Sequence, residues 1–313
     1  MKKLKLFKTL LIPSLGVLTL GTIAALATSC GSKNPDPEFV GITANANSTL
    51  TFVHEYVGDF PDLQYSTDGT SWNTYSEKIS ISQGQTLLLK GNNPEGWSHS
   101  TSTYSYLQIT NGDVSISGNV MGLLDNGATS GEEGDITAIP CDYCFYELFR
   151  NSTGITSVSD DFLPATVLKN NCYDGMFYQC TSLIKSPDLP ATSLVVSCYN
   201  YMFNGCSSLT DAPELPATNL NINCYSYMFK GCTSLTKAPD LPATSLANIC
   251  YWDMFNGCTS LNSIKIGYTG NYISSYFSGW VTNVANSGIF YYKGGQTAQD
   301  FELPSGWSII PNW

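Results

Sequence analysis

Residues 172–183 read Cys-Tyr-Asp-Gly-Met-Phe-Tyr-Gln-Cys-Thr-Ser-Leu, and residues 187–192 read Pro-Asp-Leu-Pro-Ala-Thr. The same phrase returns three more times at steps of 26 residues, beginning at Cys198, Cys224 and Cys250. A fainter copy begins at Cys144, 28 residues before Cys172. A fixed period of this length indicates a solenoid, because one unit alone cannot bury its apolar side and must stack on the next. The sequence therefore predicts stacked coils over residues 144–266.

Each unit has two halves of different character. The first half, Cys-Tyr-x-x-Met-Phe-x-Gly-Cys, is helix-like, whereas Pro187, Pro190 and their repeats exclude a helix from the second half. The last copy lacks these prolines, and its residues 261–266 are predicted to form a strand. A coil with one short strand and one helical turn is the plan of leucine-rich repeats, whose period is about 20–29 residues. We therefore expect a mixed α/β solenoid.

Two stretches resemble a known family. YMFNGCSSLTDAPELPATNL (201–220) and YMFKGCTSLTKAPDLPATSL (227–246) resemble the BspA-like leucine-rich repeats of bacterial surface lipoproteins. The phrase Phe-x-Gly-Cys-Thr/Ser-Ser-Leu carries the resemblance, with Gln179 in place of the glycine in one copy. It covers residues 144–266. Because BspA-like proteins are associated with attachment to host or matrix proteins and to other bacteria, the resemblance implies adhesion.

The composition of the chain argues against a nucleic-acid partner. The chain has 313 residues, enough for two domains, and a formal net charge of −11 with Arg150 as its single arginine. Only 12% of its residues are charged, about half the usual fraction. An acidic chain without a basic cluster lacks the electrostatic footprint that nucleic acids require. We expect no nucleic-acid binding.

The N-terminus predicts export. Four lysines precede an apolar run, residues 10–26, that Pro13 interrupts, so a plain secretory signal or a transmembrane helix is the less favoured alternative. Ala27-Thr-Ser-Cys30-Gly resembles the lipobox of bacterial lipoproteins, whose cysteine becomes diacylated. The resemblance implies a lipoprotein signal peptide over residues 1–29, lipidation of Cys30, and an anchor and tether over 30–37. The protein would then be lipid-anchored at the bacterial cell surface, touching the membrane through this anchor only.

Residues 38–126 are predicted to form a small all-β, sandwich-like domain. Apolar and polar residues alternate over 48–56, further strand-like runs follow, and Asn111-Gly112 signals a hairpin. Several short strands separated by turns are typical of a sandwich. We interpret this domain as a cap and spacer, because solenoids require capped ends. A carbohydrate-binding module is the alternative interpretation.

Two further segments flank the coils. Residues 127–143 form an acidic, Gly-rich connector, which we interpret as a solvated loop because its carboxylates match no EF-hand spacing for calcium. Residues 267–313 are aromatic and partly strand-like, as expected of a C-terminal cap closing the last coil. A sugar-binding tail is the alternative for this segment, through Trp280, Trp307 and Trp313.

The cysteines follow the repeat. Cys141-x-x-Cys144 is the single close pair, which is too little for a zinc site and weak evidence for a redox site. Stacked coils place equivalent residues about 5 Å apart, which suits buried thiols and is also within reach of a disulfide. We favour reduced, buried thiols and expect no metal and no cofactor. The structural repeat positions are Cys172, Cys180, Cys198, Cys206, Cys224, Cys232, Cys250 and Cys258, with Met176, Met202, Met228, Met254, Phe177, Phe203, Phe229 and Phe255 on the apolar side.

Charged side chains recur in the extended halves and form the first candidate binding surface, here named the charged ribbon. One predicted column holds Lys185, Asp211 and Lys237, which alternate in charge. A second column, three residues further along each coil, holds the carboxylates Asp188, Glu214 and Asp240. Stacked carboxylates repel unless compensated, and we expect Lys185 and Lys237 to compensate them. The tyrosine row at Tyr173, Tyr199, Tyr225 and Tyr251 is the second candidate if its rings are exposed. The charged ribbon comprises Lys185, Asp188, Asp211, Glu214, Lys237, Asp240 and Lys265.

No motif in the sequence indicates catalysis. The two histidines, His54 and His99, pair with no nucleophile at a recognisable spacing, and hydrolase, metalloprotease and P-loop motifs are absent from the sequence. We therefore expect a protein that is not an enzyme.

The predicted function is non-covalent binding by the solenoid, in adhesion to host, matrix or bacterial proteins. The alternative is a glycan-binding surface lipoprotein of a nutrient-uptake system, and a purely structural coat or immune-decoy protein is a third possibility. A glycan ligand requires an open Trp or Tyr platform, whereas a protein ligand requires a broad surface across several coils. The sequence does not define the oligomeric state.

Overall fold

The computed structural model describes residues 39–55, 61–75, 78–124 and 137–311. These residues all belong to one compact unit of the chain, Pro35–Trp313. The predicted signal peptide, Cys30 and its tether lie outside the described residues, as do most of the acidic connector and Trp313.

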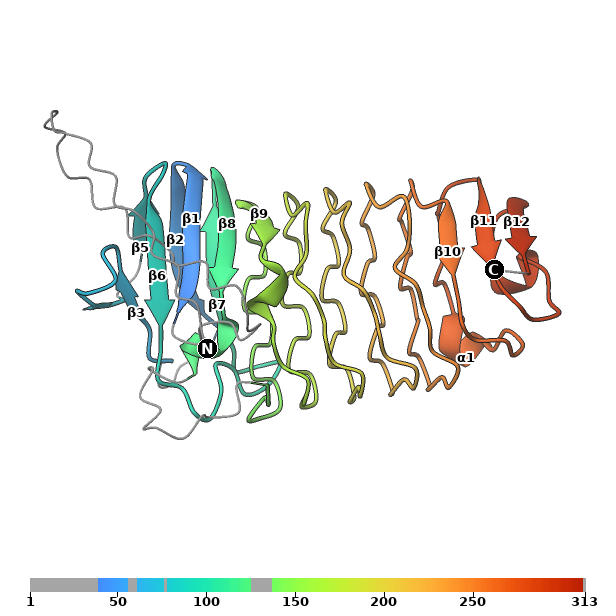
Figure 1. Cartoon of the computed structure of the whole chain (residues 1–313), viewed down its shortest axis with the longest axis horizontal. Helices are drawn as coiled ribbons and strands as arrows, with labels where there is room; N and C mark the ends of the chain where they lie inside the picture. Colours follow the sequence, from blue (N-terminus) through green and yellow to red (C-terminus); the bar gives the residue numbers. More distant parts are fainter. Residues whose placement is uncertain (1–38, 56–60, 76–77, 125–136, 312–313) are drawn as a thin grey trace, which may run out of the picture. The chain divides into compact units, whose positions relative to one another are not determined.

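The N-terminal strands and the first strand of the coils form two sheets around a shared apolar core, and all of their strand pairs but one are antiparallel (Figure 1). A six-stranded sheet has the order β4-β3-β6-β1-β8-β9, and a three-stranded sheet has the order β5-β2-β7. Alternating burial places Ile42 of β1 and Leu50 of β2 in the core. The strands are β1 (Val40–Ala46), β2 (Ser48–His54), β3 (Gln64–Ser66), β4 (Asn73–Thr74), β5 (Lys78–Ile81), β6 (Thr86–Lys90), β7 (Ser105–Thr110), β8 (Asp113–Gly118) and β9 (Ile155–Val158).

The predicted hairpin at Asn111-Gly112 is wrong, although the turn itself is present. Asn111 and Gly112 have φ values of 61° and 73°, as a two-residue turn requires. The strands on either side nevertheless pair with different partners, β7 with β2 and β8 with β1. A Cβ at Gly112 would lie 2.4 Å from the carbonyl oxygen of Asn47, which joins β1 to β2. The chain therefore crosses between the two sheets at both turns, and these turns pack together.

The first coil continues the N-terminal sheet. Strand β9 pairs in parallel with β8, and the Leu107 amide donates to the Leu148 carbonyl at 2.7 Å. The Trp97 amide donates to the Cys144 carbonyl at 2.9 Å. The hydrogen bonds of the coils thus begin on the N-terminal strands, which cover the apolar end of the first coil.

The expected helical half of each coil is a run of turns. The amides of Tyr173, Gly175 and Phe177 donate to carbonyls one coil further on, at 2.8–3.1 Å. The alternate amides, such as that of Met176, donate to the carbonyl three residues earlier. Within the described ranges the single α-helix is α1 (Ser274–Phe277). The repeats are therefore not confirmed as a mixed α/β structure, because half of their amides bond along the stack and cannot form an α-helix.

Left-handed residues explain these turns. In each coil every fourth residue of this half has a φ between 51° and 79°. In the second coil these residues are Asn171, Gly175 and Gln179, and in the fifth coil they are Ile249, Asp253 and Gly257. A left-handed residue ends any helix after one turn, and glycine and asparagine adopt this conformation at the lowest energy. The glycine in the repeated phrase Phe-x-Gly-Cys occupies such a position, which Gln179 fills in the second coil.

The extended halves carry isolated parallel bridges between coils, such as Lys185↔Asp211 and Lys237↔Ser263. Proline supplies no amide donor, so the proline-bearing coils form single bridges there, without a continuous strand. Where the prolines are absent, the predicted strand is present as β10 (Ser263–Lys265). It begins a parallel sheet with β11 (Ser287–Tyr291) and β12 (Gly306–Ile310), shown at the C-terminal end in Figure 1.

The stack of coils continues beyond residue 266, where the sequence period is lost. The Asp253 amide donates to the Ser278 carbonyl at 3.0 Å, and the Phe255 amide donates to the Trp280 carbonyl at 2.7 Å. Residues 276–281, which look strand-like in the sequence, therefore form the turn half of one more coil. Trp280, fully buried, takes the place of the repeated methionine, because it accepts the amide of Phe255 as Met254 accepts that of Phe229.

A two-residue insertion explains the one irregular step of the repeat. Lys185 pairs with Ser157, 28 residues earlier, whereas Lys185 and Asp211 are 26 residues apart. The additional residues lie in η2 (Asp160–Phe162), a short 3-10 helix whose Phe162 is fully buried against Phe149. The other short 3-10 helices are η1 (Val120–Leu123) and η3 (Gln299–Phe301).

Candidate binding surface

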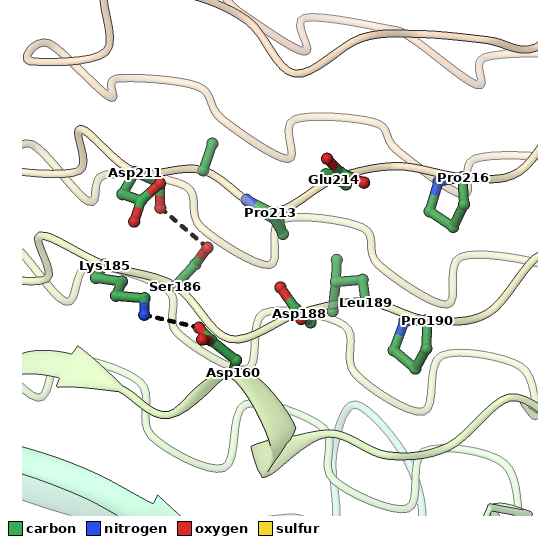
Figure 2. A pocket seen from close by; sticks show the side chains of 11 residues that line it. Asp160, Lys185, Ser186, Asp188, Leu189, Pro190, Asp211, Pro213, Glu214 and Pro216 are labelled. Atoms are coloured by element: carbon green, nitrogen blue, oxygen red, sulfur yellow. Dashed lines mark hydrogen bonds and ion pairs between the residues drawn. The ribbon is translucent and has the colours of Figure 1, made fainter. Parts of the chain in front are cut away.

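The charged ribbon lies on the extended halves of neighbouring coils. The bridge Lys185↔Asp211 places these two residues in one column, and Lys237 continues it. Three residues further along each coil, Asp188, Glu214 and Asp240 are all exposed. Figure 2 shows Asp188 and Glu214 at equivalent places on adjacent coils. The leucine after each of these carboxylates is buried, which fixes the carboxylate on the outer face: Leu189, Leu215 and Leu241.

Ion pairs on the charged ribbon reach one coil back. Lys185 Nζ lies 2.8 Å from Asp160 Oδ1, and this contact raises the pKa of Lys185. Lys265 Nζ lies 2.6 Å from Asp240 Oδ2. Both pairs are partly exposed, so they contribute little to folding stability. Of the two lysines expected to compensate the stacked carboxylates, Lys185 pairs with Asp160 of the preceding coil, whereas Asp240 is paired with Lys265, which was not one of the two.

Two adjoining hollows follow the charged ribbon. One has a volume of about 400 Å³ and extends from Asp160 to Pro216, and the other, of about 440 Å³, extends from Thr210 to Pro242. They share Asp211 and Glu214. Their walls hold five carboxylates against two lysines, together with the rings of several prolines. A surface of this kind is anionic, rigid and shallow.

Asp160 belongs to this surface and was not predicted. Its carbonyl accepts the amide of Asp188 at 2.9 Å, so it occupies the same column in the first coil. The insertion at η2 shifts it out of the 26-residue period. Aligning the first coil on its Cys144, 28 residues before Cys172, would have placed Asp160 with Asp188.

The tyrosine row at Tyr173, Tyr199, Tyr225 and Tyr251 is not a binding surface, because all four rings are at most 2% exposed. They stack within the core, with Tyr173 and Tyr199 6.0 Å apart. Burial raises the pKa of Tyr199. Trp280 and Trp307, proposed for a sugar-binding tail, are 0% and 4% exposed and donate their indole N–H groups to backbone carbonyls. Neither tryptophan offers an open ring face.

A second, half-exposed aromatic row lies on the turn halves. Tyr201 and Tyr227 stack with centroids 4.4 Å apart and planes 5° apart, and Lys230 Nζ lies 5.0 Å from the Tyr227 ring. Sequence reasoning missed this row, although Tyr-Met-Phe recurs in two copies. The rings cover one another's faces, so they present mainly their edges.

The ten described cysteines are free thiols. Cys206 Sγ donates to the Phe177 carbonyl of the preceding coil at 3.2 Å, and Cys180, Cys232 and Cys258 make the equivalent contact in their own coils. Burial raises the pKa of each of these thiols, with that of Cys180 raised to about 12. In the first coil Ser152 holds this position, and its hydroxyl donates to the Leu107 carbonyl at 3.0 Å. The buried thiols thus give these carbonyl groups, each of which also accepts the amide three residues later, a second donor.

No group of three or more His, Cys, Asp or Glu side chains suited to a metal ion occurs among the described residues. The carboxylates of the ribbon are therefore spread along the stack, not gathered at one point.

A stack of 26-residue coils with one buried leucine-bearing bend per coil defines the class of leucine-rich-repeat proteins. The model of the BspA type leucine rich repeat region matches residues 142–240 and 170–283, with six copies. The resemblance to the BspA-like leucine-rich repeats is thereby confirmed over residues 142–283. No curated protein and no solved structure matches the chain. Among the residues that the structure describes, no helix has the length and apolar character needed to cross a membrane.

Proposed function

We propose that this protein is anchored by a lipid at Cys30 on the bacterial surface and binds a protein partner through the charged ribbon. The observation that carries the proposal is the pair of adjoining hollows, which are lined by six of the seven ribbon residues. A binding surface of protein size spans about 800 Å² on each partner, which requires several coils. The ribbon crosses the coils from Lys185 to Lys265, and Asp160 extends the surface onto the first coil.

The charge of the hollows indicates the chemistry of the partner. Five carboxylates face two lysines there, in a chain of net charge −11. A partner segment carrying lysine or arginine would be steered to this surface, and its binding would weaken as salt is added. Each contact is shallow, so adhesion would depend on many anchored copies acting together.

We propose no catalytic role. Ser105 Oγ and His54 Nδ1 lie 2.8 Å apart, in hydrogen-bond contact. Ser105 is 0% exposed, so a substrate carbonyl has no path to this hydroxyl. A nucleophile requires both an adjacent base and access to substrate.

The test neutralises the exposed carboxylate column without changing its shape. The triple variant Asp188→Asn, Glu214→Gln, Asp240→Asn is compared with wild type for binding to arrays of matrix proteins and glycans. The matched control places the same change in net charge on exposed threonines of the same coils, as Thr192→Lys, Thr218→Lys and Thr244→Lys.

We expect wild type to bind a basic protein, the carboxylate variant to lose about tenfold or more in affinity, and the threonine variant to bind as wild type does. Equal losses in the two variants would show that net charge alone matters and would refute the ribbon as the site. Binding to glycans alone would support the alternative of a glycan-binding lipoprotein in a nutrient-uptake system.

A further inference from the structure

The first coil contains a pair of thiols that the later coils lack. Cys144 begins the turn half, and the thiol of Cys141, three residues earlier, hydrogen-bonds with the thiol of Cys144. In later coils the position of Cys141 is held by Lys169, Val195, Asn221 and Ala247. The thiols of these coils bond instead to the backbone of that residue. A direct contact between two thiols therefore exists in the first coil.

The two thiols differ in access. Cys144 is fully buried, whereas Cys141 is half-buried and is the one described cysteine open to solvent. All other described cysteines are buried. A reagent in solution thus reaches Cys141 first, and Cys144 is within contact of it.

A glycine makes room for Cys141. A Cβ at Gly96 would lie 2.3 Å from Cys141 Sγ, and the φ of Gly96 is +107°, which other residues rarely adopt. The amides of Trp97 and Ser98 both donate to the Cys144 carbonyl, at 2.9 and 3.1 Å. The loop that follows β6 therefore fixes the backbone at Cys144 and leaves space for the sulfur of Cys141.

The local backbone is compatible with a disulfide. Residues 141–144 form a tight bend in which Tyr143 has a φ of 58°. A four-residue turn brings its end Cα atoms within about 7 Å, the range that a disulfide also spans. The hydrogen bond between the two thiols brings their sulfurs near each other, as closure of a disulfide requires.

We propose that Cys141 and Cys144 form a reversible dithiol–disulfide site that reacts with small disulfides such as glutathione disulfide. The Cys141 thiolate attacks one sulfur of the small disulfide, a mixed disulfide forms, and one thiolate leaves. Cys144 then loses its proton and attacks Cys141 Sγ, which releases the second thiolate. Two protein thiols are oxidised to one disulfide while one small disulfide is reduced to two thiols.

The acidities of the two thiols fit these roles. The hydrogen bond from Cys144 lowers the pKa of Cys141, whereas burial raises the pKa of Cys144 well above its usual value. The thiolate is the reactive form, so Cys141 attacks first and Cys144 resolves the intermediate. This chemistry is independent of the proposed binding function of the charged ribbon.

The test equilibrates the full chain in glutathione redox buffers, traps free thiols by alkylation, and maps each cysteine by mass spectrometry. We expect the peptide containing residues 141–144 to lose two alkylation sites together and to carry no glutathione. The Cys144→Ala variant is expected to stop at the mixed disulfide, with glutathione on Cys141 increased at least about tenfold over wild type.

Two comparisons keep the result interpretable. Cys141→Ser is expected to abolish reaction of the peptide containing residues 141–144, and Cys206→Ser is expected to leave it unchanged while retaining a donor at the buried position. The proposal is overturned if glutathione remains on Cys141 in wild type, because Cys144 would then not resolve it. It is equally overturned if Cys141 stays reduced in oxidising buffer.

Discussion

Asp174 is a buried carboxyl that should make the protein less stable as the pH rises. It is 8% exposed, and burial raises its pKa from the usual 3.8 to about 7, with a smaller contribution from the charge of Glu147. The hydrogen bond from Asn200 Nδ2, at 3.0 Å, opposes this shift only in part. The equivalent residues in the next two coils are Asn200 and Ser226, which carry no charge.

The sign and size of the effect follow from the shift. Because the folded pKa is higher than the unfolded value, the folded state binds the proton more tightly. The stabilisation that protonated Asp174 contributes to the folded state is therefore fully present below about pH 4, and it is lost as the pH rises to about 7. A pKa difference of about three corresponds to about 4 kcal/mol of folding free energy. This value is an upper bound, because the native structure can relax around the charged side chain.

The variant Asp174→Asn removes the ionisation and keeps the size of the side chain. Urea unfolding at pH 5 and pH 8 is expected to show a gain of about 1–4 kcal/mol over wild type at pH 8 and a smaller gain at pH 5. Asp188→Asn, at an exposed carboxylate of the same coil, serves as the control and should follow wild type at both pH values. A pH dependence in Asp174→Asn equal to that of wild type would refute the reasoning.

Three further changes test other features of the coils. Ile249→Asn is expected to stabilise the fold by about 1 kcal/mol in thermal unfolding, because isoleucine is costly at its φ of 51°; Ile249→Val keeps the branched Cβ and should bring no gain. Cys206→Ala should cost about 1 kcal/mol in urea unfolding, since the Phe177 carbonyl keeps the Cys180 amide as a donor but loses the thiol, and Cys206→Ser should recover most of this. Arg150→Lys should cost about 1 kcal/mol of folding stability, because Arg150 Nη1 donates to the hydroxyl of Tyr104, the residue before β7, at 2.7 Å. It should also speed hydrogen exchange at the Leu107 amide of β7, which donates to the first coil; unchanged exchange there would contradict this role.

The sequence predicts the repeat, its buried positions and its charged columns, but not the local backbone. Cys172, Met176 and Cys180 recur at steps of four, a spacing that one face of a helix and a chain of four-residue turns share. The informative residues are the intervening ones. Asn171 and Gly175 stand at every fourth position, where a helix gains nothing from them and a left-handed turn favours them.

The two ends of the stack were less predictable, for a physical reason. The repeated residues are required only where a coil packs between two neighbours of the same shape. The first coil packs on β7 and β8, so it can carry Ser152 and the insertion at η2. The last turn half packs on β11 and η3, and a tryptophan, Trp280, fills the larger space there and donates to the Phe301 carbonyl. The end coils therefore lose the repeated sequence motif but keep the backbone hydrogen bonds between coils.

The uniform register between coils bears on how such a protein can change over generations. Each inner coil donates to the next through the same set of amides, as the pairs Tyr173–Cys198 and Tyr199–Cys224 illustrate. Duplication or loss of one 26-residue segment by recombination would therefore preserve every contact at the two ends. The recognition surface would lengthen or shorten in increments of about 5 Å, so its reach and avidity can be altered in a single genetic event without a new fold.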